Sequence, residues 1–313
     1  MIADVVALCT AAYVVIDDLY QAYLAPLDRR PGPRGQCSDS EIVALTLVAE
    51  LVGLDEAVAF LAYLRRNHPT LFPRLPERSR YNRRRRALQE ATGTLRRLIQ
   101  RRVWAALPAD RRDLCVIDSL PVPVVGFAHA CGRHRWRGHA GYPRTGVGYN
   151  ATKKQALYGF TRHLLATHSG LILDVALVPA NIVDGDLSAQ LLQDQTGLTV
   201  LGDKAYLSAA LRERLRHPCA GTRNGVDLLA PTKANARAPM ATPLVRRIAH
   251  FRQAIETLNS QLAGQCNVER NRAKCLSGLC ARVQATLAAH TLGISLNQQA
   301  DQPLLALKPL ALI

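Results

Sequence analysis

The chain has 313 residues, of which 48% are hydrophobic and 20% charged, so it is long enough for about two domains with a buried core. Lys and Arg number 40 against 24 Asp and Glu, which gives a net charge of +16 and a pI near 10.0. This surplus indicates a polyanionic partner, most often nucleic acid, although the dominance of Arg before Lys153 is also typical of a GC-rich genome.

Cysteine usage and the N-terminal segment bear on where the protein works. The eight cysteines are scattered and lack C-x-x-C pairs, so neither a disulfide framework nor a paired-cysteine metal site is expected. The apolar N-terminal stretch has no basic segment in front of it, is interrupted by Asp4 and is ended by Asp17 and Asp18. No run is judged long enough to span a membrane, and the sequence predicts a reduced, cytoplasmic protein without a membrane partner.

Residues 1–110 are predicted to form an all-α region, because Ala and Leu dominate and strand-like alternation is scarce. Residues 26–37, rich in Pro, Gly and Arg, are predicted to be a loop. The next helix should begin at Ser38, which can cap the first turn while Glu41 reaches back to it. A further helix is expected from 56 to 66.

The most basic stretch runs from Arg74 to Arg112. A short helix, a turn and a basic helix here would fit a helix-turn-helix, whose second helix enters the major groove of DNA. The alternative is a solvated helix face whose arginine stems cover apolar surface. Four consecutive arginines cover every side of a helix, so we predict DNA contact through Arg83, Arg84, Arg85 and Arg86.

From Leu114 the pattern changes to short apolar runs, which predicts an α/β domain over 111–300 and an apolar tail over 301–313. Strands are expected at 114–117, 156–167, 170–179, 198–202 and 228–231, with the second and third paired as a hairpin. Helices are expected at 186–194, 208–216, 244–262 and 278–295, and a loop at 126–150. This order implies a mixed sheet flanked by helices.

Three carboxylates stand out against that pattern. Asp118 and Asp203 each follow an apolar strand run, and ligand sites of α/β proteins gather at strand ends. Glu256 lies at the edge of an apolar helical stripe, one turn after Arg252. Each has an ordinary alternative: a turn cap for Asp118, a helix cap or a pair with Lys204 for Asp203, and a surface pair with Arg252 for Glu256.

Together the three carboxylates predict a two-metal site. Mg²⁺ prefers hard carboxylate oxygens and keeps water and substrate phosphate as its other ligands. Two such ions support in-line phosphoryl displacement without a protein nucleophile. The sequence contains no G-x-S-x-G, P-loop or H-E-x-x-H motif that would indicate another chemistry.

Four segments resemble motifs of the DDE transposases of bacterial insertion sequences, in the family's order and wide spacing. They are Val116-Ile117-Asp118-Ser119-x-Pro121-Val122-Pro123, Pro179-x-Asn181-x-x-Asp184, Gly202-Asp203-Lys204-x-Tyr206 and Arg252-x-x-Ile255-Glu256-x-x-Asn259. The resemblance covers about residues 114–296. It implies a ribonuclease-H-like fold, with the first Asp on the first strand, the second Asp after the fourth strand and the Glu on a late helix.

The resemblance also implies a function. Such an enzyme binds the terminal inverted repeats of its element, then cuts DNA strands and transfers them to target DNA with Mg²⁺, for which Mn²⁺ can substitute. It acts as a homodimer or a larger synaptic complex. Asp118 would bridge two ions, Asp203 and Glu256 would hold one each, and Lys204 and Arg252 would contact DNA.

One position departs from the family. Many relatives carry Lys two helical turns after the Glu, where this chain has Ala263, and Arg270 or Arg272 is a candidate replacement. Two other functions therefore stay open: a catalytically inactive DNA-binding derivative of a transposase, and another ribonuclease-H-like nuclease such as a resolvase.

A second basic segment interleaves aromatic and charged residues, as surfaces that bind single strands do. DNA contact is predicted for Arg133, Arg135, Trp136 and Arg137, against the alternative of a flexible surface loop. Cys131, His134 and His139 lie nearby but lack a fourth ligand close in sequence, so zinc is not favoured.

Overall fold

The computed structural model describes residues 4–310 except 29–34, 55, 126–144, 151–153, 183–189, 193–194, 207–210, 212, 214, 216–224, 233–237, 265, 267–272 and 274. The chain divides into two compact units: Met1–Ala105 with Ser260–Ile313, and Ala106–Asn259. The predicted boundaries at 110 and 300 differ from this division. The C-terminal helix and tail join the N-terminal unit, because they pack on its helices.

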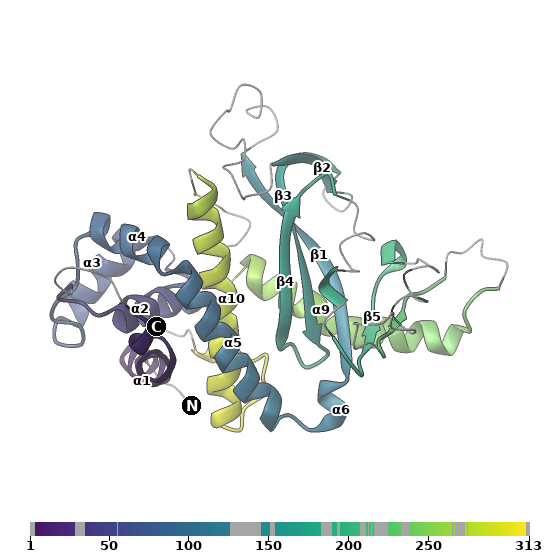
Figure 1. Ribbon diagram of the computed structural model, residues 1–313, viewed down its shortest axis with the longest axis horizontal. Coiled ribbons are helices and arrows are strands. Elements are labelled where there is room, and N and C mark those ends of the chain that lie inside the picture. The colour runs from purple at the N-terminus through teal and green to yellow at the C-terminus, as the bar shows by residue number, and fades with distance from the viewer. Residues whose placement is uncertain are drawn as a thin grey trace. The chain divides into compact units, whose positions relative to one another are not determined.

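The first unit consists of helices (Figure 1). They are α1 (Val5–Tyr23), α2 (Asp39–Leu51), α3 (Ala57–Asn67), α4 (Arg78–Ala87), most of α5 (Gln89–Ala106) and α10 (Leu276–Gln299). α2 packs against α1, α4 and α10. From Ile42 to Leu51 its side chains are buried on every side, and all of them are apolar except Thr46 and Glu50. α2 and α10 therefore form the core of this unit.

The beginning of α2 confirms the predicted capping box. The backbone N–H of Glu41 donates to Ser38 Oγ at 3.1 Å, and the backbone N–H of Ser38 donates to Glu41 Oε2 at 2.6 Å. Two N–H groups that no helical carbonyl can reach are satisfied in this way.

The C-terminal tail is part of the same core. Leu307 and Leu310 are buried, and Asn297 Nδ2 donates to the carbonyl oxygens of Leu304 and Ala306 at 3.1 Å. Gly293 on α10 allows this approach, because a Cβ there would lie 2.7 Å from Leu307 Cδ2. The apolar sequence of the tail is explained by this packing.

α1 corrects one expectation. Its 19 residues have a mean hydropathy of 1.4, so by length and composition this helix could cross a membrane. A core helix of a soluble protein and a signal sequence satisfy the same criterion. In the structure, Leu8, Cys9, Ala12, Ile16 and Leu19 form a fully buried stripe, and α1 packs on α2.

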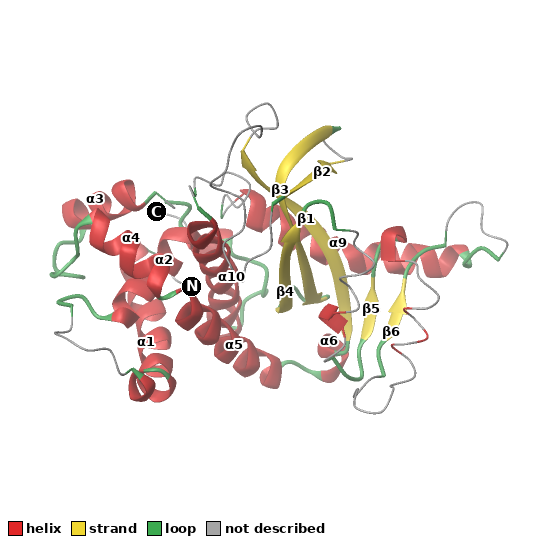
Figure 2. Ribbon diagram, turned by 45° about the horizontal axis from the view of Figure 1, so that its top comes forward, coloured by secondary structure: helices red, strands yellow, loops and turns green. Residues whose placement is uncertain are grey.

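The second unit is built on a mixed sheet (Figure 2). Its strands are β1 (Leu114–Val125), β2 (Gly146–Asn150), β3 (Gln155–Thr167), β4 (Ile172–Pro179), β5 (Thr199–Leu201) and β6 (Asp227–Leu229). The order is β2-β3-β1-β5-β6, with β4 also paired to β3. β1, β3 and β4 are antiparallel neighbours, whereas β5 and β6 run parallel to β1. The predicted mixed α/β sheet and the β3–β4 hairpin are confirmed.

Two strands differ from their predicted extents. β2 lies inside the expected loop 126–150. Its glycines are typical of loops, but here they allow a close approach of the backbone: a Cβ on Gly148 would come within 2.6 Å of the Ala180 carbonyl oxygen. β1 continues to Val125 through Pro121 and Pro123. These prolines occupy alternate positions, and β5 pairs with β1 only as far as Val116, so the missing N–H groups can face an edge without a described partner strand.

The helices of this unit are α6 (Ala109–Arg112) and most of α9 (Thr242–Gly264), which was expected at 244–262. α10, expected at 278–295, begins two residues earlier and ends four later. The helices predicted at 186–194 and 208–216 fall largely outside the described residues.

Candidate active site

The sheet places Asp118 and Asp203 at the same level. β1 and β5 run in parallel, and Val116 pairs with Leu201 at the last rung that they share. Each aspartate comes two residues after that rung, Asp118 still inside β1 and Asp203 just beyond the end of β5. Neighbouring strands lie about 4.8 Å apart, so the chain that carries Asp203 leaves the sheet close to the backbone of Asp118.

Asp118 is therefore inside a strand, and not at its end as predicted. It pairs with Leu164 of β3 and is partly exposed. Asp203 does follow its strand directly, at the start of the 3-10 turn Lys204–Tyr206. The buried Tyr206 packs against Gly202, where a Cβ would lie 3.0 Å from Tyr206 Cβ. This tight contact explains why the segment Gly202-Asp203-Lys204-x-Tyr206 forms a turn that fixes Asp203.

α9 brings a polar side chain into contact with Asp118. Asn259 Nδ2 donates to Asp118 Oδ2 at 2.8 Å, across 141 residues of sequence. Asn259 is 8% exposed, and its Oδ1 atom is buried without a hydrogen-bond partner among the described residues. The sequence holds a signal for this residue, because Asn259 ends the motif that carries Glu256, but the motif alone gives it no role.

The contact through Asn259 determines where Glu256 and Arg252 lie. They precede Asn259 on α9 by three and seven residues, so by helical geometry both lie on adjoining parts of one face. Glu256 is exposed beside the buried Ile255 and Leu258, at the edge of the apolar stripe as predicted. No ion pair joins Arg252 to Glu256 in the part of the chain that the structure describes.

A complete metal cage is not formed by these side chains. Within the described ranges, no group of three or more His, Cys, Asp or Glu residues is arranged to hold a metal ion. Asp118 and Asp203 follow the same rung of the sheet, and Glu256 lies on α9, the helix whose Asn259 contacts Asp118. The three carboxylates are nevertheless not gathered into one cluster. The donor chemistry itself suits Mg²⁺, which takes hard carboxylate oxygens. The three-carboxylate site stays a prediction.

The four consecutive arginines of α4 are not equivalent. Arg84 forms a two-pronged ion pair with Asp39, with Nε–Oδ1 and Nη2–Oδ2 distances of 2.6 Å. Tyr20 Oη donates to the same carboxylate at 2.9 Å. The Arg85 guanidinium lies over the Tyr81 ring, 5.9 Å from its centre. Arg83 and Arg86 are exposed, so only part of the run can face a ligand.

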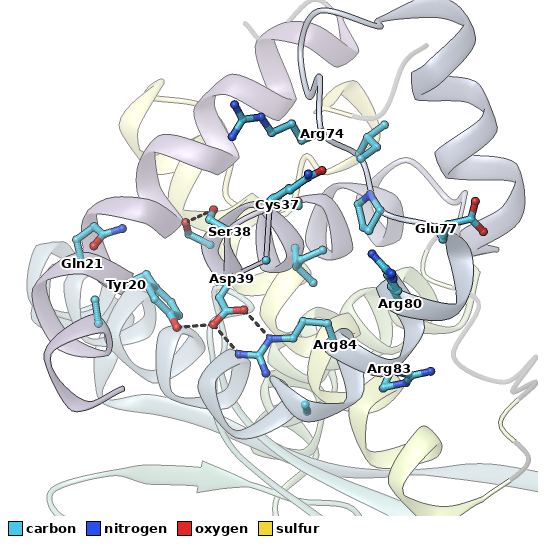
Figure 3. Close-up of a pocket in the computed structure, with 18 residues that line it drawn as sticks. Tyr20, Gln21, Cys37, Ser38, Asp39, Arg74, Glu77, Arg80, Arg83 and Arg84 are labelled. Atoms are coloured by element: carbon cyan, nitrogen blue, oxygen red, sulfur yellow. Dashed lines mark hydrogen bonds and ion pairs between the residues drawn. The ribbon is translucent and has the colours of Figure 1, made fainter. Parts of the chain in front are cut away.

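A pocket of about 880 Å³ opens beside this helix (Figure 3). α4 contributes Arg80, Arg83 and Arg84, and the preceding loop contributes Arg74 and Glu77. Cys37 also lines it, but burial, followed by the nearby Glu41 charge, raises the pKa of its thiol to about 12, so it is not an activated nucleophile. With Arg84 neutralised by Asp39, the remaining arginines outnumber Glu77, and the pocket suits an anionic group.

The Arg84–Asp39 pair leads to a stability prediction. Arg84→Ala should lower the free energy of unfolding by about 2 kcal/mol, because it leaves a largely buried carboxylate without its charged donors. Arg83→Ala removes an exposed arginine of the same helix and should change it by less than about 0.5 kcal/mol. Urea denaturation of both variants measures the difference. Equal losses would show that the ion pair contributes nothing specific.

The remaining predicted residues are placed as follows. Lys204 is exposed in the turn after Asp203, and Ala263 is half-buried near the end of α9. Arg133, Arg135, Trp136 and Arg137 lie outside the described residues, as do Cys131, His134, His139, Arg270 and Arg272.

Comparison with known proteins places these segments in a family. The sequence pattern of the transposase DDE domain matches residues 109–276, more than half of the chain. No curated protein matches the chain. Among solved structures, the chain is similar to piggyBac transposase in the cryo-EM structure of its synaptic complex with hairpin DNA, with 11% sequence identity and a TM-score of 0.46. That similarity covers 99% of this chain and 79% of the other.

Proposed function

This chain belongs to the transposase DDE domain family, and from that premise we propose that it is an active DNA transposase of an insertion sequence. It binds the terminal inverted repeats of its element and catalyses metal-dependent strand cleavage and strand transfer. The observation that carries the proposal is that Asp118 in β1 and Asp203 just after the parallel strand β5 follow the same rung of the sheet, with α9 joined to Asp118 through Asn259.

A ribonuclease-H-like catalytic fold is part of the proposal. The family expectation puts the first Asp on the first strand, and Asp118 is on β1. It puts the second Asp after the fourth strand. Asp203 follows β5, which is the fourth strand when β2, paired only to the far end of β3, is left out of the count. Glu256 lies on the late helix α9, as the expectation requires.

Asp118, Asp203 and Glu256 would hold two Mg²⁺ ions, with Mn²⁺ able to substitute. When bound, such ions activate the attacking oxygen and stabilise the leaving oxygen of a phosphoryl displacement. The chain's own residues supply the rest. Asn259 fixes the Asp118 carboxylate by a hydrogen bond, Tyr206 and Gly202 fix the turn that carries Asp203, and α9 presents Arg252 beside Glu256.

The helical unit is proposed to supply much of the DNA affinity. α4 carries the arginines predicted for DNA contact, and the exposed Arg80 and Arg83 line the pocket beside Arg74. Arg84 is paired with Asp39, so its proposed contribution to DNA binding is to hold α4 in place. The assembly is proposed to be a homodimer or a larger synaptic complex on DNA, in the cytoplasm and without a membrane partner.

The DNA-binding role gives a prediction with a matched control. The double variant Arg80→Ala/Arg83→Ala should bind DNA more weakly and reduce the slope of log K against log salt by about 0.9 for each phosphate that the variant no longer neutralises. Arg101→Ala/Arg102→Ala removes the same charge from exposed sites on α5 and should leave the slope nearly unchanged. Filter binding in EDTA measures both. Equal slopes for the two variants would indicate diffuse attraction and argue against the pocket.

The function itself is tested by strand cleavage. Purified full-length protein is incubated with labelled linear DNA that carries the inverted repeats flanking its gene, in Mg²⁺ or in EDTA. The proposal expects Mg²⁺-dependent cuts at the element end. Binding without cleavage would identify an inactive DNA-binding derivative, and cleavage confined to branched junctions would identify a different nuclease.

A further inference from the structure

The pocket beside α4 has an inner wall that side-chain contacts hold in place. The Asp39 carboxylate at the start of α2 accepts hydrogen bonds from Tyr20 of α1 at 2.9 Å and from Arg84 of α4 at 2.6 Å, so it joins three helices. The buried Tyr81 shares a hydrogen bond of 2.9 Å with Thr46 Oγ1, which fixes α4 against α2. A wall built in this way is formed before any ligand arrives, and this lowers the cost of binding one.

The charged groups at the edge of the pocket have no such partners. Arg74, Arg80 and Arg83 are exposed, and in the part of the chain that the structure describes none of their guanidinium groups forms an ion pair or a hydrogen bond. Glu77 stands at the N-cap of α4, but its carboxylate makes no cap hydrogen bond. Three unpaired guanidinium groups and a single unpaired carboxylate from these described residues therefore line the pocket (Figure 3), which favours a ligand with negative charge.

Much of the remaining lining is apolar. Carbon surface comes from Ala25, Ile42, Leu75, Pro76 and Ala87. The volume of about 880 Å³ falls within the range of about 300–1,000 Å³ that is typical of sites for small organic ligands, and it exceeds what an inorganic anion alone needs. A DNA double helix is too thick to enter such a pocket. The ligand should therefore join an anionic group to a compact apolar body.

Two polar side chains of the lining indicate what kind of body this is. Gln36 has no hydrogen-bond partner among the described residues, and its amide can both donate and accept, whereas the Glu77 carboxylate only accepts. Nucleobases carry amino and carbonyl groups on the edge of a flat ring, and Gln and Glu side chains pair with such edges. A guanidinium plane also stacks on a base. A fatty acid or a detergent would leave Glu77 without a donor.

We propose that this pocket binds a single nucleotide, with the phosphate at Arg74, Arg80 and Arg83 and the base against the apolar wall, within reach of Gln36 and Glu77. A free nucleotide and an unpaired nucleotide of a DNA strand present the same chemistry. The second source rests on the proposed function. In that case the pocket holds a nucleotide that has left the stack, at the energetic cost of unstacking, while neighbouring phosphates contact the exposed arginines.

Calorimetric titration of the full-length protein in EDTA tests the pocket. We expect dCMP to bind at least about tenfold more tightly than inorganic phosphate or deoxycytidine, because only the nucleotide uses both ends of the pocket. Arg74→Ala should weaken dCMP binding by about tenfold or more, since it removes a charged donor to the phosphate, whereas Arg101→Ala, at an exposed site on α5, should not.

A third variant separates a nucleotide site from a simple anion site. Ala87→Trp fills apolar space without changing the charge and should weaken binding of dCMP but not of phosphate. Thermal melts verify that each variant is folded. Affinity for dCMP no higher than for phosphate would overturn the proposal, and so would a dCMP affinity that Ala87→Trp leaves unchanged.

Competition with a fluorescent dCMP derivative identifies the source of the nucleotide. The competitors are two short duplexes that differ only in one unpaired nucleotide. Displacement mainly by the duplex with the unpaired nucleotide would assign the pocket to DNA, and displacement by neither would assign it to a free nucleotide. Equal displacement by both would show that duplex phosphates occupy the site, and would overturn the entry of a base.

These measurements do not depend on cleavage. Nucleotide binding by a protein that cuts no DNA would refute the transposase activity and leave the pocket intact. Mg²⁺-dependent cleavage by a protein that binds no nucleotide would refute the pocket and leave the transposase activity intact.

Discussion

Asp118→Asn, Asp203→Asn and Glu256→Gln are each expected to lower the rate of Mg²⁺-dependent DNA cleavage by about 10³-fold or more. Each substitution keeps the size of the side chain and removes one negative charge. Metal-assisted phosphoryl transfer draws several kcal/mol of transition-state stabilisation from the ions that these carboxylates would hold, and each 1.4 kcal/mol is a factor of about ten in rate. Single-turnover cleavage of labelled DNA ends measures the loss.

Two further measurements make the result specific. Filter binding in EDTA should give nearly unchanged DNA affinity for all three variants, because the proposed DNA contacts on α4 lie elsewhere in the chain. Asp174→Asn removes a carboxylate from the same sheet on the opposite face and should cleave at close to the wild-type rate. If any of the three variants cleaved as fast as Asp174→Asn, the residue it replaces would not belong to the site.

The stability of the variants should also differ. Asp118 is hydrogen-bonded to Asn259 inside the unit, whereas Glu256 is exposed on α9. Asp118→Asn is therefore expected to destabilise the fold measurably, and Glu256→Gln should not, since surface substitutions away from packed contacts change stability by about 0.5 kcal/mol or less. Loss of cleavage without loss of stability in Glu256→Gln gives the clearest evidence for chemistry.

Local patterns predicted much of the fold. The capping box at Ser38, the hairpin of β3 and β4 and the extent of α9 all follow from residues that are neighbours in sequence. β2 was missed because its glycines are typical of loops, although they permit a close approach of strands here. β1 was predicted too short, because proline usually ends a strand when no free edge is available to accommodate it.

Long-range contacts could not be predicted in this way. The bond from Asn259 to Asp118 joins residues 141 apart, and periodicity carries no information about such a pair. The burial of Arg162 depends on the register of three strands, which becomes known only when the sheet is formed. The addition of α10 and the tail to the helical unit likewise depends on packing and not on any boundary in composition.

The structure distinguishes between two interpretations of Arg252, an ion pair with Glu256 and a contact with a ligand. As the partner of Glu256 in an exposed i,i+4 pair it would contribute about 0.5 kcal/mol or less. The described residues contain no such ion pair. Instead, Arg252 is half-buried, and among those residues its buried Nε–H group has no hydrogen-bond acceptor. An unsatisfied donor on the face of α9 that leads to Asp118 favours a role in binding a ligand over a role in stability.

Arg252→Ala is therefore expected to lower the single-turnover cleavage rate by about 10²-fold, the loss typical when one fixed donor to a reacting centre is removed, with a much smaller effect on DNA affinity. Arg252→Lys should recover only part of the rate, because an ammonium cannot grip phosphate in the two-pronged way of a guanidinium. Arg246→Ala, at an exposed site earlier on α9, is the matched control and should cleave normally. If Arg252→Ala cleaved as fast as this control, with an unchanged melting temperature, the phosphate contact would be refuted and Arg252 would be an ordinary surface residue.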